Sequence, residues 1–242
     1  MKLQILNTGS KGNCYVLGDT EKLIIECGVN IDDIMQSINY DISSVAGCIV
    51  SHEHGDHAKS LIKLANKGID VYATKGTIEA INVTHRRCHE ISYMTKYKLK
   101  SFNIMPFESQ HDAREPCGFI INHEELGNLL FLTDSYYCKF KFKNLNHIMI
   151  EANYRALILE EKIIAGKIPA AVYKRIKKSH FEIEDVKEFL KASELNKVSE
   201  IVLIHMSDSN SDANFKKEIE NCTGVPTIEA LSGICLNLER WI

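Results

Sequence analysis

The sequence predicts an α/β protein in which two β-sheets pack face to face between outer layers of helices. Three observations support this fold. The first fifty residues and the middle of the chain are both rich in short β-branched runs, and the last third alternates helical patterns with single apolar strands. Because a sheet must bury a face against another element, two β-rich halves flanked by helices indicate paired sheets inside helical layers.

The expected elements of the first half are mostly strands. We expect strands over 3–7, 14–18, 22–28 and 46–51, with a helical piece before the last of these. The segment AKSLIKLANKG has apolar side chains at helical spacing and ends in a glycine, so it predicts a helix over 58–68, followed by a strand over 69–74.

The second half begins with strands and ends with helices. We expect strands over 99–109, 117–122, 128–134 and 147–153, helices over 155–167 and 182–195, and then a strand, a helix and a strand over 200–206, 212–222 and 233–239. No Ser-, Pro- or Gly-rich linker and no block of like charge interrupts the chain, so we expect a single domain over residues 1–242.

The composition is that of an ordinary globular protein, with 45% hydrophobic and 25% charged residues. The net charge of −3 argues against a long nucleic acid as partner, since such proteins usually carry a basic excess. We find no segment typical of a secretory signal or a membrane span, and the eight cysteines are scattered without a C-x-x-C pair. We therefore expect reduced cysteines and a cytoplasmic protein.

The segment VSHEHGDHAKS concentrates three histidines and one aspartate in six positions. At the end of a strand, residues two apart point the same way, so His52 and His54 can converge on one metal ion. The chain then turns at a glycine, and Asp56 and His57 can bind a second ion, because imidazole and carboxylate are ligands of zinc, iron and manganese. A hydrogen-bonded histidine loop or a tag-like artefact is the alternative.

Three further residues end apolar runs, where a rigid element can hold a metal ligand in place. His111 follows FNIMPFES in SQHD, Asp134 ends LLFLTD, and His205 follows IVLI. Each of them alone would more often be an edge residue with satisfied hydrogen bonds. In this order after H-x-H-x-D-H, they predict a site for two metal ions.

The motifs SHEHGDH, SQHD, LTDS and LIHMSD resemble, in this order, the successive metal-binding motifs of the metallo-β-lactamase fold. That resemblance implies a four-layer αββα sandwich with a dinuclear site at one edge. The opening NTGSKGNCYVLG further resembles the YycJ-type branch, and the tail resembles tRNase Z-like phosphodiesterases. The resemblance extends nearly from end to end.

The resemblance also implies a division of the metal ligands. Glu26, in LIIECG, stands where the family usually has an aspartate, and we expect it to brace the metal-binding loop with altered geometry. We expect two divalent ions, with zinc preferred over manganese. By position, one ion would be held by His52, His54 and His111, the other by Asp56, His57 and His205, and Asp134 would bridge them.

Glu151 in MIEAN and His180 in SHFEIED look like the pair with which tRNase Z-like phosphodiesterases protonate the leaving oxygen. An alkoxide is a poor leaving group, and an imidazolium held by a carboxylate is a good acid near neutral pH. Alternatively, Glu151 caps a turn, and His180 or Ser179 caps the helix that follows. We assign Asp56, Glu151 and His180 to catalysis, with a hydroxide between the two metals as the attacking group.

The size of the chain favours a small substrate. Enzymes of this superfamily that process long RNA usually carry an inserted domain or a protruding basic arm, and we expect neither within 242 residues. The resemblance therefore favours a small nucleotide, such as a cyclic mononucleotide. Some phage-encoded members of the fold destroy cyclic nucleotide immune signals and are similar in size and motifs. A phage-encoded chain would act in the host cytoplasm.

The competing substrate is a single-stranded nucleic-acid end, as for nuclease-like YycJ relatives. The runs KFKFK (139–143) and YKRIKK (173–178) could bind a phosphate backbone, with Tyr136 and Tyr137 stacking on bases. Such basic runs are more often solvated faces.

Several other polar residues have weaker assignments. Arg114 and Lys178 are candidate substrate contacts. His85 and His89 stand at helical i, i+4 spacing but lack a third ligand, so we expect an exposed helix or loop there. We expect strand-edge positions without a role for two further histidines, His123 and His147.

Three other classes are the alternatives. They are a thioester or lactam hydrolase on the same fold, an enzyme of iron-based oxygen or sulfur chemistry, and a binding protein with structural metals. The first does not need the acid formed by Glu151 and His180, and the third conflicts with a ligand set that leaves coordination positions open. We also expect a homodimer, because relatives often pair and a neighbouring subunit could complete a small active site.

Overall fold

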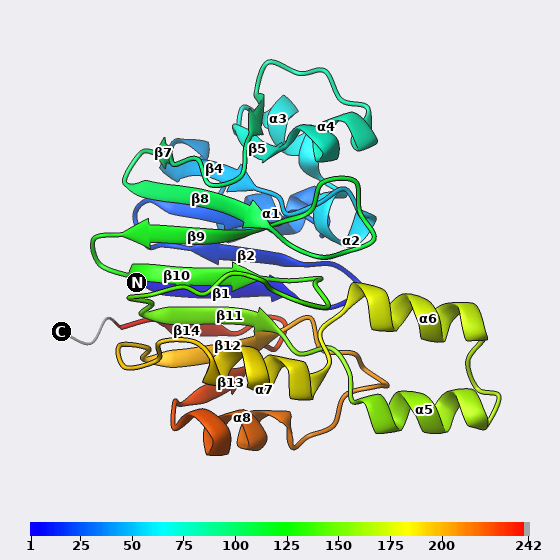
Figure 1. The fold of residues 1–242 in the computed structure, drawn as a ribbon. Coiled ribbons are helices and arrows are strands. Elements are labelled where there is room, and N and C mark those ends of the chain that lie inside the picture. Colours follow the sequence, from blue (N-terminus) through cyan, green and yellow to red (C-terminus); the bar gives the residue numbers. More distant parts are fainter. Residues whose placement is uncertain (240–242) are drawn as a thin grey trace.

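Two mixed β-sheets of seven strands each lie face to face within residues 1–239, which the computed structural model describes (Figure 1). The first sheet has the order β14-β1-β2-β3-β4-β5-β6, with β1 (Lys2–Asn7), β2 (Cys14–Leu17), β3 (Lys22–Ile25), β4 (Val45–Ile49), β5 (Val71–Thr74), β6 (Cys88–Ile91) and β14 (Cys235–Asn237). The second has the order β13-β12-β11-β10-β9-β8-β7, with β7 (Tyr97–Leu99), β8 (Phe102–Glu108), β9 (Cys117–His123), β10 (Gly127–Leu132), β11 (His147–Glu151), β12 (Glu200–Ile204) and β13 (Thr227–Glu229).

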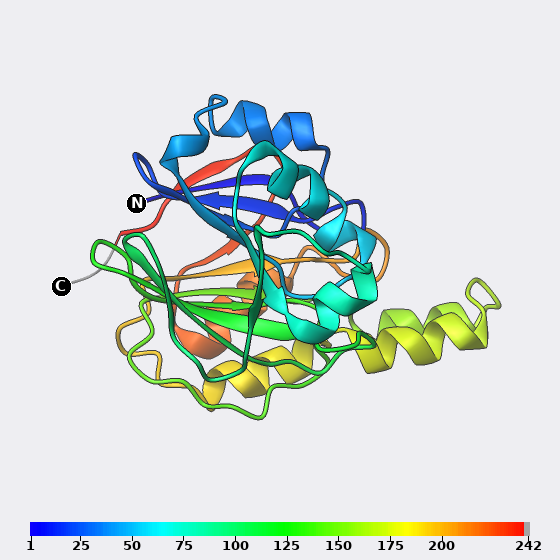
Figure 2. The same cartoon turned by 90° about the horizontal axis from the view of Figure 1, so that it is seen from above.

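Helices lie on the outer sides of both sheets (Figures 1 and 2). Those of the first half are α1 (Ile31–Ser37), α2 (Gly55–Ala58), α3 (Leu61–Lys67) and α4 (Lys75–Ile81), and those of the second half are α5 (Ala156–Ile164), α6 (Ala170–Ser179), α7 (Ile183–Lys191) and α8 (Phe215–Thr223). Ile34 of α1 and Leu64 of α3 pack on the first sheet, and Val186 of α7 and Ile219 of α8 pack on the second. The predicted αββα order of layers is confirmed.

A further apolar cluster fills the space between the sheets. In β10, Leu129 and Phe131 point into this space, whereas Leu130 and Leu132 point to the outer layer, because successive side chains of a strand alternate. Phe131 meets Tyr15 of the first sheet edge to face, with ring centroids 5.8 Å apart. The two sheets thus share one core, and a single domain over residues 1–242 stays a prediction.

The strands that precede the polar motifs run in a common direction within each sheet. β3 and β4 are parallel, as are β10, β11 and β12. β8 has the same direction as β10, because both are antiparallel to β9. The segments that follow the carboxyl ends of these strands therefore leave each sheet at one edge, where ligands bind in sheets of this type.

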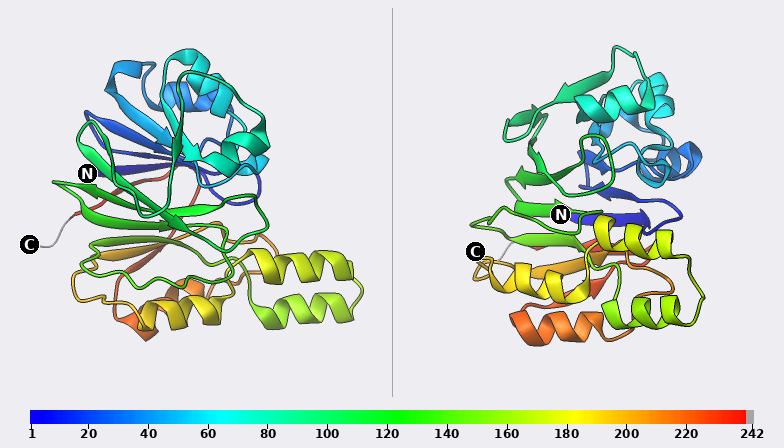
Figure 3. Two further views of the ribbon diagram at one scale, coloured as in Figure 1. Left: turned by 45° about the horizontal axis from the view of Figure 1, so that its top comes forward. Right: turned by 45° about the vertical axis from the view of Figure 1, so that its right-hand side comes forward.

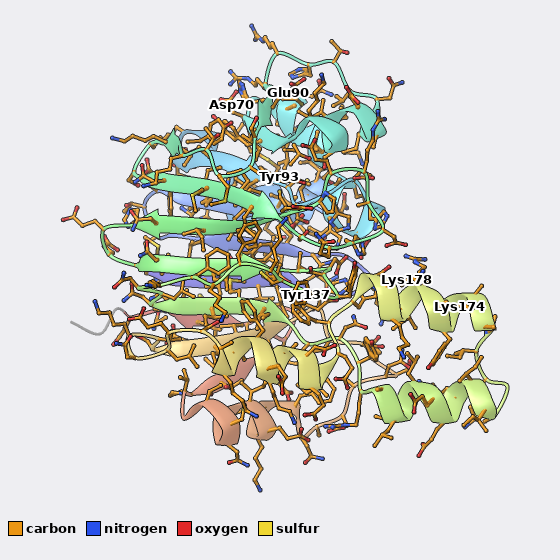
Figure 4. The ribbon with its side chains drawn as sticks, in the orientation of Figure 1. Asp70, Glu90, Tyr93, Tyr137, Lys174 and Lys178 are labelled. Carbon is orange, nitrogen blue, oxygen red and sulfur yellow. The ribbon has the colours of Figure 1, made fainter. Side chains whose placement is uncertain are left out.

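α5 and α6 form a helical pair that extends away from the sheets (Figures 1 and 3). Lys174 and Lys178, labelled in Figure 4, lie along α6, which also carries Arg175 and Lys177. The expectation that no protruding basic arm fits in this chain is wrong, because residues 156–179 suffice for two short antiparallel helices.

Other differences from the expected elements are local. Residues 99–109, expected as one strand, belong to the hairpin of β7 and β8, with Lys100 in the left-handed conformation (φ 50°) at its turn. The helical alternative for the segment that contains His85 and His89 is wrong, since His85 lies in a loop and His89 in β6. Three observed elements were not predicted, because their sequences are short or mostly polar: α4, α6 and β13.

None of the helices in residues 1–239 combines the length and the apolar composition needed to cross a bilayer.

Phe131→Ala should lower the free energy of unfolding by about 3–5 kcal/mol, because it opens a cavity in the core between the sheets. Urea unfolding followed by circular dichroism measures the change. Ile164→Ala, which truncates a side chain that is 86% exposed, is the control and should change stability by no more than about 0.5 kcal/mol. Equal stabilities of the two variants would contradict the role of Phe131 in joining the sheets.

Candidate metal centre

The sequence-predicted metal ligands come together at one edge of the sandwich. They follow the carboxyl ends of β4, β8, β10 and β12, and two of them lie on the short helix α2 directly after β4. Two groups of predicted ligands have their ligand atoms within 4.8 Å of one another: His52, His54, His111 and Asp134 in the first group, and Asp56, His57, Asp134 and His205 in the second. A third group of the same kind, Asp134, Glu151, His180 and His205, overlaps the second.

In the first group, three imidazole nitrogens converge. Nδ1 of His54 lies 3.1 Å from Nε2 of His52 and 3.0 Å from Nε2 of His111. A tetrahedral zinc ion with bonds of 2.0–2.1 Å would hold its ligand atoms about 3.3 Å apart, so this spacing fits a shared ion. Burial lowers the pKa of both His52 and His111, which keeps these rings neutral with a lone pair to donate.

Asp134 belongs to both groups. Its Oδ2 atom lies 2.9 Å from Nε2 of His57 and 3.4 Å from Nε2 of His52. Burial raises the pKa of this carboxyl, but the charges of His205 and His57 outweigh burial and hold the pKa well below its usual range. A single carboxylate oxygen that faces both groups fits a bridge between two ions.

The second group contains two carboxylates and two imidazoles. Oδ2 of Asp56 lies 3.5 Å from Nε2 of both His57 and His205. Burial lowers the pKa of both rings, but Asp134 and the other carboxylates around them outweigh burial and raise the pKa of His205 to about 9 and that of His57 well above its usual range. Such nitrogen and oxygen donors suit a divalent ion of the zinc or manganese type.

An unpartnered buried atom supports a metal ion at the second group. His57 is fully buried, and its Nδ1 has no hydrogen bond within residues 1–239. The closest carboxylate oxygen to it, Oε2 of Glu26, is 3.4 Å away. With Nε2 on a metal, Nδ1 carries the proton, and Glu26 is the acceptor within reach. The donors and their orientation thus fit a dinuclear divalent metal site.

Glu26 also holds the start of the metal-binding loop, because its carboxylate accepts the backbone N–H of Ser51 at 3.2 Å. The side chain is fully buried, and the backbone of Glu26 is left-handed (φ 62°), which non-glycine residues adopt mainly under constraint. That this geometry differs from the one an aspartate would give stays a prediction. Glu26 is therefore in a position to brace the loop.

Asn13 belongs to the site although the sequence analysis assigns it no role there. Its Nδ2 atom lies 3.1 Å from Nε2 of His57, and its backbone N–H donates to the carbonyl of Asp56 at 2.7 Å. Gly28 lies against the same segment, where a Cβ atom would stand 1.7 Å from the Asp56 carbonyl oxygen, so only glycine fits. The stretch TGSKGNC contains Asn13, but no spacing rule marks it as part of a site.

The buried Glu151 and the partly exposed His180 form a pair beside Asp134. Oε1 of Glu151, the last residue of β11, lies 2.7 Å from Nδ1 of His180 and 3.1 Å from Nδ1 of His205. Burial lowers the pKa of His180, but the charge of Glu151 and a hydrogen bond with Asp134 outweigh burial and raise it to about 10. The capping alternative for the segment at His180 is wrong, because Glu182 caps α7 with its side chain.

These groups line a cavity of about 290 Å³. Arg175 of α6 also lines it, and its Nε lies 3.3 Å from Oδ2 of Asp112. Sequence reasoning missed Arg175, because YKRIKK contains four cations and no pattern selects one of them. The ligand residues that face the cavity are His54, Asp56, His111, Asp134 and His205, together with His180.

Arg114 and Lys178 do not line this cavity. Arg114 forms an ion pair with Glu79 of α4 at 2.7 Å, and Lys178 is exposed on α6. Their assignment to the substrate stays a prediction.

Six of the ten histidines lie in the site, and four lie outside it. Nε2 of His89 binds Asp70 at 2.8 Å, and His147 at the start of β11 pairs with Glu200. The remaining two are His85 and His123, of which His123 ends β9. None of the four belongs to a group of possible metal ligands within residues 1–239.

Comparison with known proteins agrees with this geometry. Residues 23–206 match the model of the Lactamase_B_2 family, described as a beta-lactamase superfamily domain. The chain is 27% identical over 227 residues to exodeoxyribonuclease YycJ of Bacillus anthracis, and the match covers 87% of this chain and 84% of that protein.

Solved structures share the fold over almost the full length. The metallo-β-lactamase fold protein YhfI from Bacillus subtilis has a TM-score of 0.72 at 15% identity, with 97% of this chain and 98% of that chain covered. The short form of human tRNase Z has a TM-score of 0.63 at 14% identity, with 98% and 99% covered. At such identities the likeness shows the fold.

Glu26→Gln should weaken metal binding by about 10–100-fold, because an amide offers one acceptor oxygen to the two N–H groups that the carboxylate faces. Competition with a chelator of known affinity, followed by metal analysis, measures the change. Glu21→Gln alters a carboxylate far from the site and should leave metal affinity as it is. Unchanged affinity in Glu26→Gln would remove Glu26 from the metal centre.

Proposed function

This chain belongs to the Lactamase_B_2 family of beta-lactamase superfamily domains, and we propose that it is a metal-dependent hydrolase of phosphodiester bonds in a nucleotide or nucleic acid. The observation that carries the proposal is the pair formed by the buried Glu151 and the partly exposed His180 beside the two ligand groups. The relative named exodeoxyribonuclease YycJ supports the same reaction class.

The two ligand groups would hold two divalent ions, preferably zinc, with Asp134 shared between them. When bound, such ions supply an attacking group from water at neutral pH and neutralise the phosphate oxygens. Asp56 lies on the cavity wall and would both bind metal and accept a hydrogen bond from the attacking water. Manganese is the alternative ion.

His180 would protonate the leaving oxygen. Its Nδ1 is held by Glu151 at 2.7 Å, which leaves Nε2 as the free ring nitrogen of a side chain that lines the cavity. Because the raised pKa keeps the ring protonated at neutral pH, it can deliver a proton to an alkoxide. The cleavage of a thioester or lactam does not need this acid, so the pair favours phosphodiesters over those alternatives.

For the substrate we place a single-stranded nucleic-acid end first. The protruding pair α5 and α6 removes the argument against polymers, and Arg175 extends its positive charge to the cavity. A cyclic mononucleotide is the second candidate, because a cavity of about 290 Å³ lies at the lower limit of small-molecule pockets. A homodimer and a cytoplasmic location stay predictions.

His180→Ala should keep its metal content and lower kcat by about 10²–10⁴-fold, because only the proton donor is removed. Metal analysis and steady-state kinetics on a phosphodiester measure the two effects separately. His123→Ala, which removes a histidine outside the site, is the matched control. Full activity of His180→Ala would refute the acid assignment.

A hydrolysis panel with added metal should separate the two substrates. It compares single-stranded DNA and RNA oligonucleotides with 3′,5′-cyclic mononucleotides, with Asp134→Ala as the blank. We expect shortening of oligonucleotides that falls steeply with salt, because each phosphate contact releases counterions. If only the cyclic mononucleotides are hydrolysed, at a rate that does not depend on salt, a cyclic mononucleotide replaces the nucleic-acid end as the substrate. Cleavage only of a thioester or lactam would contradict the reaction class.

A further inference from the structure

A second, larger cavity of about 780 Å³ lies on the outer face of the second sheet, over β8, β9 and β10. In Figure 1 no helix lies in front of β8 and β9. Irregular segments that include residues 94–96 and 140–145 border this face, whereas α7 and α8 cover the strands beyond it. We call this cavity the outer groove.

The floor of the outer groove carries a row of side-chain amides. Asn103 of β8 pairs with Asn122 of β9, which pairs with Asn128 of β10, so the three side chains share one face of the sheet. Nδ2 of Asn122 donates to Oδ1 of Asn128 at 2.9 Å, and the Asn103 amide has no partner within residues 1–239. The floor therefore offers free hydrogen-bond donors and acceptors.

The rim of the outer groove is positive. Lys96, Lys141 and Lys143 line it, all three are exposed, and none forms an ion pair or hydrogen bond within residues 1–239. Lys139, by contrast, is neutralised by Glu108. No carboxylate lines the groove, so its charge is complementary to an anion.

Aromatic side chains border the groove, and two tyrosines precede them in the segment that follows Asp134. Phe140 and Phe142 line it and pack against Phe107. Along the chain, Tyr136 and Tyr137 stand between Asp134 and Phe140, and they are 41% and 57% exposed. Tyr137, labelled in Figure 4, lies at the end of the sheet nearest to α6.

The groove is a few nucleotides from the metal centre. Asn128 on its floor, near the start of β10, stands six residues before Asp134, which corresponds to about 20 Å of extended chain. A strand whose end lies at the metals can therefore reach the groove with its next nucleotides.

We propose that the outer groove binds the single-stranded body of a nucleic-acid substrate while its end lies at the metal centre. The lysines would contact phosphates, the aromatic rings would stack on bases, and the amides would bond to base edges. The inference rests on the proposed function. It adds a substrate-binding surface that lies outside the metal centre. An acidic peptide would pair with the lysines, but it would not explain the row of side-chain amides.

The test reverses charge at the groove. K141E/K143E is compared with K216E/K217E, which makes the same charge change at exposed lysines of α8. Binding of a fluorescent single-stranded DNA of about 12 nucleotides with a hydrolysis-resistant phosphorothioate backbone is measured by anisotropy on the metal-loaded protein, so that the strand is not cut. We expect about tenfold weaker binding for K141E/K143E alone. The slope of the logarithm of the binding constant against the logarithm of the salt concentration should also become smaller, by about 0.7 for each phosphate that the removed lysines would have neutralised.

A second variant tests the floor without touching a lysine. Asn103→Asp places a carboxylate in the amide row and should also weaken DNA binding, whereas Asn196→Asp, at an exposed site elsewhere, should not. Equal binding by the groove variants and their controls would overturn the proposal. So would groove-dependent binding of a labelled Glu/Phe-rich peptide in place of DNA.

Turnover of a small chromogenic diester separates the two proposals, because that compound cannot span to the groove. For K141E/K143E, the loss in kcat/KM on the oligonucleotide should exceed the loss on the diester by about tenfold. If the protein hydrolyses the diester but the groove variants bind DNA as well as their controls do, the role of the outer groove is refuted and the proposed function stands. Groove-dependent DNA binding without turnover of any diester would overturn the proposed function alone.

Discussion

A carboxylate buried between two groups of imidazoles is the constraint on which the rest of this structure depends. Asp134 is 2% exposed, and the removal of a carboxylate from water costs several kcal/mol unless opposite charges and hydrogen bonds compensate. Its compensating partners come from segments as distant in sequence as His57 and His205. The strands that carry these segments must therefore end at the same edge, and the core between the sheets holds them there.

The site divides into two electrostatic halves around this carboxylate. Burial lowers the pKa of His52 and His111 and keeps both rings neutral, although Asp134 acts in the opposite direction on each. His205 and His180 face Glu151 as well as Asp134, which raises their pKa. Ligands must be unprotonated to bind metal, so ions that enter the second half displace protons from His57 and His205. The pair of Glu151 and His180, by contrast, retains the proton that an acid needs.

The placement of the helices explains both the outer groove and the helical pair α5 and α6. α7 and α8 follow the parallel strands β11 and β12 and cover that part of the second sheet, while the antiparallel strands β8 and β9 connect through hairpins and bring no helix with them. The outer face above these hairpin strands thus carries polar amides in place of a packed layer. α5 and α6 lie on the other side of the centre, with Arg175 turned to its cavity.

The sequence by itself predicted the layer order and the set of candidate metal ligands that the structure brings together, because both depend on local patterns. Alternating apolar residues mark each strand, and a histidine or aspartate at the end of such a run is readable without coordinates, as for Asp134 and His205. The tertiary structure alone decided which cation faces the cavity, that Asn13 contacts His57, and that Asn103, Asn122 and Asn128 form one row. Those contacts join residues far apart in the chain, and no periodicity encodes the register or helix orientation that brings them together.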